Sequence, residues 1–220
     1  MSEEVCPTCG ASTSPETYTS RLLIVGEGLA DQVFFRQLAR HRGIPDLQAA
    51  GPAKGKDFTN RLEAMRGFAP ETSTIVLVAD SDSDHAASFE LVRDQIRAVG
   101  DYGVPTRPLE VIKGRGAPAV AVLTLPWIDR NGNLETLLLD AMSEKSPTVR
   151  VEVDRLIAAT VLRARGISKD SKARFACMVA CICDDDPSCA ASTMWYAAKG
   201  FQGLLDHKCF DPITDYLKSL

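Results

Sequence analysis

Two groups of carboxylates are the residues best suited to chemistry in this sequence, and each group follows a short apolar run. Glu27 comes after residues 22–25 and is flanked by Gly26 and Gly28, whose conformational freedom lets the backbone turn sharply and approach a ligand. The alternating aspartates of residues 80–84 come after the apolar run 75–79. If the extended backbone continues past Ala79, these aspartates project on the same side, where their charges repel unless a proton or cation neutralises them. Hard carboxylate oxygens suit Mg²⁺ or Mn²⁺, so the pattern predicts a divalent cation site.

A parallel sheet is the element that would bring the two groups together. Residues 22–25 and 75–79 have the continuous apolar character of strands that are covered on both faces. In open α/β sheets, the chemistry sits at the carboxyl ends of such strands. Strands alternate with helices through residue 142, which predicts a mainly parallel, doubly wound α/β sheet. The further strand candidates are residues 47–50, 109–112 and 119–125, and the expected helices are 31–40, 58–65, 89–99 and 134–142.

The chain divides into three parts on composition and pattern. Residues 1–19 form a tail rich in Ser, Thr, Pro and Glu, and residues 20–145 form the α/β domain. Residues 146–220 form a helical extension that packs on that domain. Within this extension we expect helices near residues 149–165, 169–182 and 190–204, and a last one that ends at residue 220.

The order of these motifs resembles the Toprim domain, which topoisomerases, bacterial primases, recombination proteins and nucleases of the "overcoming lysogenization defect" type share. The resemblance covers roughly the first 125 residues and rests on Glu27-Gly28-x-x-Asp31 and on Asp80-x-Asp82-x-Asp84, each after an apolar strand. It implies that Glu27 is a general acid/base and can also contact the metal. It further implies that Asp80 and Asp82 bind Mg²⁺ and that Asp84 helps them. Gly26 departs from the family pattern, which usually has a larger aliphatic residue there.

A finer resemblance links the chain to small stand-alone Toprim proteins of poorly defined function. It rests on residues 125–138, which contain Gly-Asn-Leu-Glu-Thr-Leu-Leu, and on the ending at residues 210–217. In those proteins and in the nucleases, a further acidic residue and a lysine join the site. By this resemblance Glu135 and Lys172 are the matching residues, with Lys172 in a catalytic role, and Asp31 is a further candidate.

The reaction that this resemblance implies is Mg²⁺-dependent hydrolysis of phosphodiesters in nucleic acid. The sequence contains no recognisable DNA-gate, primase zinc, helicase or ATPase module, so hydrolysis requires the least additional machinery. By analogy alone, such proteins belong to microbial defence or repair systems. Two alternatives stay open: a haloacid-dehalogenase-type phosphatase, with Asp80 as nucleophile and Asp82 as acid/base, and a non-catalytic Toprim scaffold.

Charge composition restricts how nucleic acid would bind. The chain of 220 residues has a net charge of −4 and a pI of about 5.4, whereas proteins that bind mainly by neutralising phosphates are usually basic. We therefore expect local contacts, with Lys54, Lys56, Lys113 and Arg115 as candidates for binding phosphate groups. The sequence leaves open a homodimer or a complex with a partner protein.

Cysteines and apolar runs bear on location and on zinc. No apolar run reaches the length of a membrane span, and the first residues lack the pattern of a signal peptide, so we expect a cytoplasmic protein without a membrane partner. Its seven cysteines should then be mostly reduced. Cys6-x-x-Cys9 is half of a zinc knuckle, and a four-ligand site would need partners such as Cys181, Cys183 and Cys189. We expect a tail without zinc, with a zinc clasp as the alternative.

Overall fold

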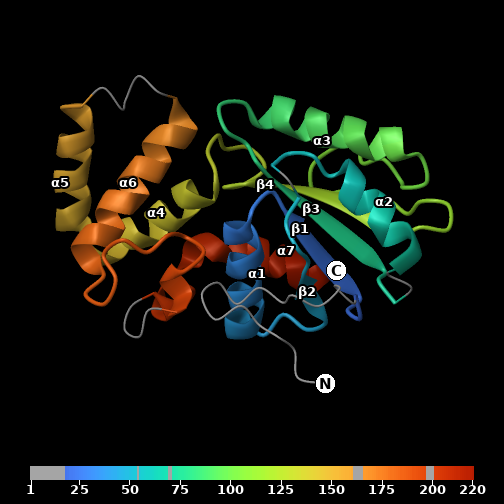
Figure 1. Ribbon diagram of the computed structural model, residues 1–220, viewed down its shortest axis with the longest axis horizontal. Coiled ribbons are helices and arrows are strands. Elements are labelled where there is room, and N and C mark those ends of the chain that lie inside the picture. The colour runs from blue at the N-terminus through green and yellow to red at the C-terminus, as the bar shows by residue number, and fades with distance from the viewer. Residues whose placement is uncertain (1–17, 54, 69–70, 161–165, 197–200) are drawn as a thin grey trace.

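The fold is α/β, as the strand and helix pattern predicts, and its centre is one parallel sheet (Figure 1). The computed structural model describes residues 18–53, 55–68, 71–160, 166–196 and 201–220. Its four strands pair in the order β2-β1-β3-β4, with all three pairings parallel. The strands are β1 (Leu22–Gly26), β2 (Leu47–Ala49), β3 (Thr74–Asp80) and β4 (Ala119–Leu125).

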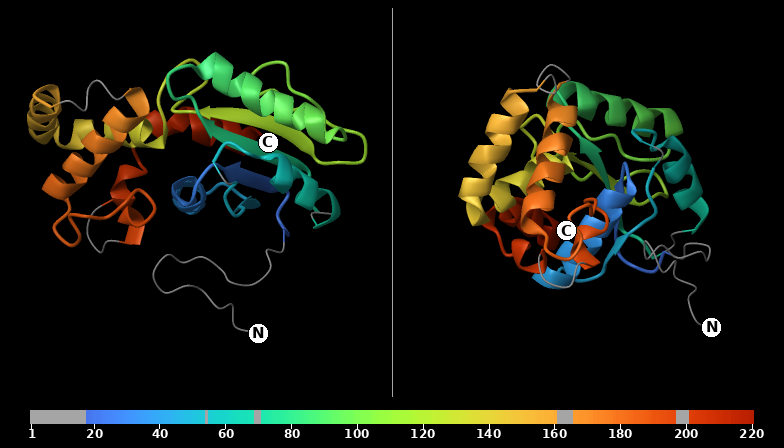
Figure 2. Two further views of the ribbon diagram at one scale, coloured as in Figure 1. Left: turned by 45° about the horizontal axis from the view of Figure 1, so that its top comes forward. Right: turned by 60° about the vertical axis from the view of Figure 1, so that its left-hand side comes forward.

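Both faces of the sheet are covered by helices (Figure 2). The connecting helices are α1 (Leu29–Arg42), α2 (Thr59–Phe68) and α3 (His85–Val99). Because side chains alternate along a strand, Ile24 and Val76 share a core with α1, whereas Val25 and Ile75 share one with α2 and α3. This double burial explains why β1 and β3 are continuously apolar.

The strand order changes direction at the carboxyl ends of β1 and β3. These two strands are neighbours, but α1 leads from β1 to β2 on one side and α3 leads from β3 to β4 on the other. Adjacent chains therefore leave the sheet edge in opposite directions, which is the topological switch point where ligands of open α/β sheets bind. Glu27 and Asp80 both lie at this point.

The C-terminal helices complete the core on the α1 face of the sheet. Figure 1 shows α4, α5 and α6 beyond the end of the sheet toward which the strands run, whereas α7 returns beside α1. Ile213 and Leu217 of α7 belong to the core that contains Phe34 of α1, and the hydroxyl of Tyr216 donates to the carbonyl of Leu109 at 3.1 Å. The bounds are α4 (Leu134–Lys145), α5 (Pro147–Ala158), α6 (Ile167–Ile182) and α7 (Asp211–Ser219).

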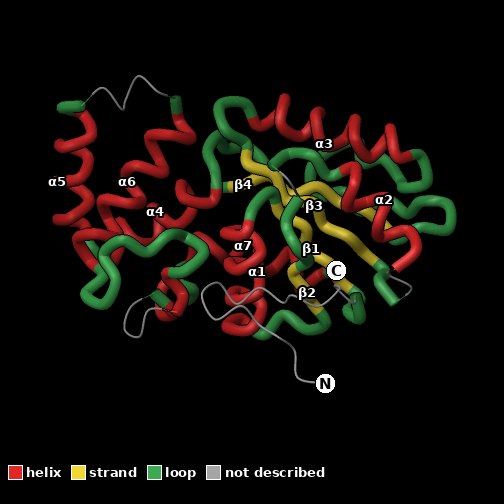
Figure 3. The backbone as a smooth tube through the Cα atoms, in the orientation of Figure 1, coloured by secondary structure: helices red, strands yellow, loops and turns green. Residues whose placement is uncertain are grey.

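Two expected elements are different in the structure (Figure 3). Residues 109–112 are not a strand, because Leu109 has φ 65° and only Ile112 bridges to Val120, in an antiparallel sense. Within 190–204, the described residues form only the 3₁₀ turns Met194–Tyr196 and Gln202–Leu204. Met194, Trp195 and Leu204 are buried from these short turns, so their burial does not require the longer helix that the apolar spacing predicted. No helix among the described residues combines the length and the apolar character needed to cross a membrane.

Candidate functional site

Glu27 and Asp80 meet at the carboxyl edge of the sheet. In the parallel register Gly26 pairs with Val78, so the residue after β1 lies beside the end of β3. The Oε1 atom of Glu27 accepts a hydrogen bond from the backbone N–H of Asp80 at 2.7 Å. Two residues that are 53 positions apart are thereby held in one place by sheet pairing.

The first turn of α1 adds a buried carboxylate, Asp31, to this edge. Asp31 is 6% exposed, and its Oδ2 atom accepts a hydrogen bond from the N–H of Gly28 at 2.9 Å. A Cβ atom at Gly26 would lie 2.3 Å from the Cβ of Asp31, far inside van der Waals contact. Any larger residue at position 26 would therefore displace Asp31.

The loop after β3 separates the three aspartates. Asp80 is the last residue of the strand and Asp82 has φ 48°, so the extended backbone expected through residue 84 ends early. The N–H of Asp82 donates to the carbonyl of Gly132 at 2.7 Å, which ties this loop to the start of α4. Asp84 is the N-cap of α3, where its Oδ1 accepts from the N–H of Ala87 at 3.0 Å. Asp84 thus has a structural role, whereas Asp80 and Asp82 stay at the sheet edge.

Helix α4 begins against Asp80. The N–H of Leu134 donates to Oδ1 of Asp80 at 3.2 Å, so the positive end of the helix dipole faces this carboxylate. Glu135 lies in the same first turn. Among the charges that raise the pKa of Asp80 are those of Asp31 and Glu135, so these groups share one electrostatic neighbourhood.

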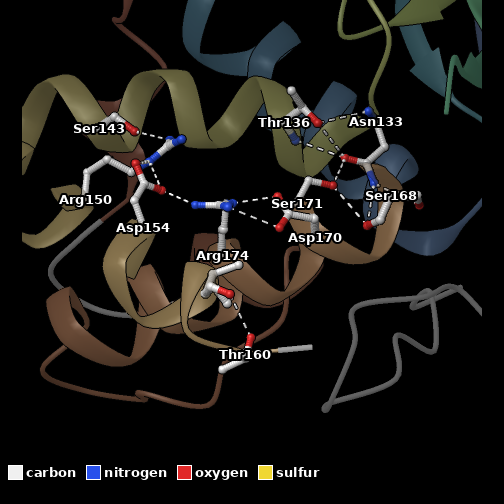
Figure 4. Close-up of polar contacts among 11 residues, drawn as sticks. Asn133, Thr136, Ser143, Arg150, Asp154, Thr160, Ser168, Asp170, Ser171 and Arg174 are labelled. Carbon is white, nitrogen blue, oxygen red and sulfur yellow. Dashed lines mark hydrogen bonds and ion pairs between the residues drawn. The ribbon is translucent and has the colours of Figure 1, made fainter. Parts of the chain in front are cut away.

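Asn133 positions this helix start, a role that was not predicted from the sequence. It is fully buried and caps α4 through the N–H of Thr136 at 3.0 Å. Its amide also accepts from the Ser171 hydroxyl at 2.8 Å and donates to the Ser168 hydroxyl at 3.2 Å, which joins α4 to α6 (Figure 4). The available signal was Asn-x-x-Thr ahead of the apolar run 137–139, which is typical of a helix start.

We define the acidic edge as Glu27, Asp31, Asp80, Asp82 and Glu135. Burial and repulsion between like charges perturb several of these carboxylates. Burial, with the neighbouring carboxylates, raises the pKa of Asp80 to about 8. Burial also raises the pKa of Glu27 to about 7, although the Asp80 N–H and the charge of Lys56 oppose the shift. Burial raises the pKa of Asp31 to about 6 and raises that of Glu135. The acidic edge therefore favours any added proton or cation.

Two lysines approach the acidic edge from different elements. Lys56, in the loop before α2, places its ammonium 2.8 Å from Oδ2 of Asp82 and 3.9 Å from Oε1 of Glu27. Lys172 on α6 is exposed, and its charge lowers the pKa of Asp31 and of Glu135. The sequence suggested Lys56 only as a phosphate contact, whereas here it is a partner of the acidic residues.

Two of the other predicted residues, Lys113 and Arg115, lie away from the acidic edge. Lys113 and Arg115 are exposed in the loop that precedes β4, at the amino ends of the strands. The seven residues of β4 separate them from the acidic edge, a strand length of ~20 Å. Lys54 and the pair Cys6 and Cys9 lie outside the described residues.

The chemistry of the donor set fits a hard divalent cation, because every donor at the acidic edge is a carboxylate and their charges reinforce one another. Within the described ranges, no group of three or more His, Cys, Asp or Glu side chains is already arranged to hold a metal ion. Oε1 of Glu27 is engaged by the Asp80 N–H, and Oδ2 of Asp82 is engaged by Lys56. A cation at the acidic edge would therefore compete with these contacts.

Comparison with known families gives one match. Residues 20–220 match a family model described as "Protein of unknown function (DUF3226)". The chain belongs to this family. The match spans both the α/β domain and the C-terminal helices, so the DUF3226 family unit includes Asn133 and Lys172 as well as Glu27 and Asp80. No curated protein and no solved structure matches the chain.

Proposed function

We propose that this DUF3226 chain is a Toprim-type protein that hydrolyses phosphodiester bonds of nucleic acid with the help of Mg²⁺ or Mn²⁺. The observation that carries the proposal is the contact between Glu27 and the N–H of Asp80 at the switch point of the sheet. A general acid/base and a metal ligand on neighbouring strands would act on one phosphate group. The mutual repulsion of the acidic edge supplies the affinity for a cation.

Asp80 is the central ligand candidate in this proposal, with Glu27, Asp82, Asp31 and Glu135 as its neighbours. A bound Mg²⁺ would polarise the phosphate and lower the pKa of a water molecule. Glu27 has a pKa near 7, so its carboxyl group can either accept or release a proton at neutral pH. The helix N-terminus at Leu134 orients the Asp80 carboxylate and reduces its freedom to rotate.

Lys172 is the residue that would face the substrate. It is exposed on α6, and its charge acts on Asp31 and Glu135, so it belongs to the same electrostatic neighbourhood as the acidic edge. An ammonium group in this position would attract a phosphodiester toward carboxylates that otherwise repel it. The loop with Lys113 and Arg115 is at the opposite edge of the sheet and has no part in this proposal.

Cleavage assays test the proposal directly. Single-stranded DNA, double-stranded DNA and RNA are incubated with the full chain and Mg²⁺ or Mn²⁺, and the variants Glu27→Gln and Asp80→Asn are compared with Asp84→Asn. We expect metal-dependent cleavage that Glu27→Gln and Asp80→Asn reduce by ~10²-fold or more, because each removes a group that acts on the reacting phosphate. Asp84→Asn should cleave like the wild type, because asparagine also caps a helix.

The same assay separates the alternatives. Turnover of small phosphomonoesters without cleavage of polymers would replace the nuclease with a phosphatase in which Asp80 is the nucleophile. Absence of both activities, together with absence of metal binding, would leave a scaffold that binds a partner.

A further inference from the structure

Lys56 is held at the acidic edge more rigidly than a surface lysine. Its ammonium donates to the carbonyl of Asp80 at 2.7 Å and to the hydroxyl of Ser88 at 3.2 Å, and pairs with Oδ2 of Asp82 at 2.8 Å. These three partners match the three N–H donors of an ammonium group. The hydroxyl of Ser88 in turn donates to the carbonyl of Ser81, which joins this network to the loop after β3.

The backbone of Lys56 is fixed as well. Gln95 of α3 donates its amide N–H to the carbonyl of Lys56 at 2.6 Å and accepts from the N–H of Phe58 at 2.7 Å. The side chain of Phe58 is fully buried in the core under α2 and α3. Since both the main chain and the ammonium are anchored, the positive charge of Lys56 is part of the folded framework.

The partners of Lys56 are the same kind of atoms that a divalent cation would bind. It contacts a carboxylate oxygen, a main-chain carbonyl and a hydroxyl, and a second carboxylate oxygen, Oε1 of Glu27, lies at 3.9 Å. Hard oxygen atoms of these types make up the coordination shells of Mg²⁺ and Mn²⁺ in proteins. Lys56 therefore offsets the negative charge on the Asp82 and Glu27 side of the acidic edge. The Asp31 and Glu135 side is left for another cation.

We propose that Lys56 is a permanent cation of the acidic edge and occupies a position that a divalent ion would otherwise take, so that the wild-type chain binds one divalent ion fewer than its carboxylates would allow. This inference rests on the proposed metal dependence of the acidic edge, but it concerns the number of ions and not the reaction. Lys56 is in this sense a positioning residue, because it holds Asp82 and the main chain of Asp80 while a bound ion occupies the remaining side.

Counting bound Mn²⁺ on the full chain tests the inference without nucleic acid. Metal-free wild type and Lys56→Gln are titrated with Mn²⁺ by calorimetry, and the number of bound ions is checked by the loss of the free Mn²⁺ electron paramagnetic resonance signal. Glutamine removes the charge and keeps an amide donor for the Asp80 carbonyl, on a side chain that is one atom shorter. We expect Lys56→Gln to bind one Mn²⁺ more than the wild type, whereas Lys56→Arg, which keeps the charge, binds the wild-type number.

Two controls make the result specific. Lys218→Met removes an exposed lysine on α7 and should leave the number of ions unchanged, which separates the position of Lys56 from overall charge. Thermal unfolding with and without Mn²⁺ establishes that each variant is folded. If Lys56→Gln is unfolded without metal, the titration is made with Lys56→Met, for which the same gain of one ion is expected.

The outcomes distinguish this inference from the proposed function. A gain of one ion in Lys56→Gln supports the inference even where the wild type, with its own ion bound, cleaves no nucleic acid, a result that would remove the proposed nuclease. An unchanged number of ions in Lys56→Gln overturns the inference even where the wild type binds Mn²⁺ and cleaves nucleic acid.

Discussion

Two groups of charged residues, the acidic edge and the arginine–aspartate chain between α5 and α6, are organised in opposite ways. At the acidic edge, Asp80 is surrounded by carboxylates whose charges raise its pKa to about 8. Between α5 and α6, charges of opposite sign alternate: Arg150 binds Asp154 at 2.8 Å, Asp154 also binds Arg174, and Arg174 binds Asp170 at 2.6 Å (Figure 4). Like charges gather in the first group, and each charge has an opposite neighbour in the second.

This difference suits the two groups to different roles: the acidic edge is the candidate functional site, and the arginine–aspartate chain is a structural contact that holds α5 against α6. The hydrogen bond and charge of Asp170, with those of Asp154, raise the pKa of Arg174, which means that the folded state favours the charged form of this guanidinium. At the acidic edge the folded state disfavours the charged forms. Residues that oppose folding in this way persist at functional sites, and their removal commonly raises stability while it lowers activity.

The largest effect should come from Asp80→Asn. We expect cleavage of nucleic acid to fall by ~10²-fold or more, because the central ligand is lost. In metal-free buffer at about pH 8, the same variant should have a higher melting temperature than the wild type, because the buried like charge is gone. Melting curves with and without Mg²⁺ measure the second effect. A variant less stable than the wild type at that pH would contradict the idea that repulsion at the acidic edge opposes folding.

The pH dependence of stability should show the same repulsion in the wild type. The folded pKa values of Asp31, Glu27 and Asp80 are about 6, 7 and 8, all above the ordinary values of 3.8 to 4.5. The folded state therefore holds these protons more tightly than the unfolded state, and the stabilisation is full below about pH 4 and lost as pH rises through the folded pKa values.

We expect the free energy of unfolding of the metal-free chain to fall by several kcal/mol between about pH 5 and pH 8. Urea unfolding at several pH values measures this slope. Asp80→Asn should flatten it, and added Mg²⁺ should offset it, whereas stability that increases over this range would be the opposite of the expected result.

Arg174→Met should destabilise the fold by about 2 kcal/mol, because it leaves Asp170 and Asp154 half-buried without their shared partner. Arg155→Met is the matched control, since Arg155 pairs with Glu152 on the exposed face of α5 and should have no measurable effect. Chemical unfolding of both variants gives the difference. Equal stabilities of the two variants would show that the arginine–aspartate chain does not stabilise the packing of α5 against α6.

The smallest effect concerns Asp84, which belongs to the acidic sequence but not to the acidic edge. Asp84→Ala should cost about 1 kcal/mol through loss of the α3 cap, and Asp84→Asn should cost almost nothing. Neither variant should change the number of bound Mn²⁺ ions. A loss of metal binding in Asp84→Asn would return Asp84 to the group of ligands.

Periodicity and residue type along the sequence determined the central strands of this protein and several of the helices that cover them. The apolar runs 22–25 and 75–79 predict β1 and β3, and a parallel arrangement predicts that Glu27 and Asp80 share one sheet edge. The spacing of apolar residues likewise predicts α1, α3 and α4. These predictions succeed because strand alternation and helix periodicity are local properties of the chain.

Only the tertiary structure decided which residues join that edge. Asp84 follows Asp80 by four positions yet turns away to cap α3, because the positive φ of Asp82 redirects the backbone. Lys56 lies 24 positions before Asp80 and contacts it, since Gln95 holds the intervening loop on α3. Such contacts depend on loops and on pairings between distant elements, and no local pattern encodes them. The sequence therefore determined the sheet and the presence of an acidic edge. Packing determined which residues belong to that edge and which lysine offsets its negative charge.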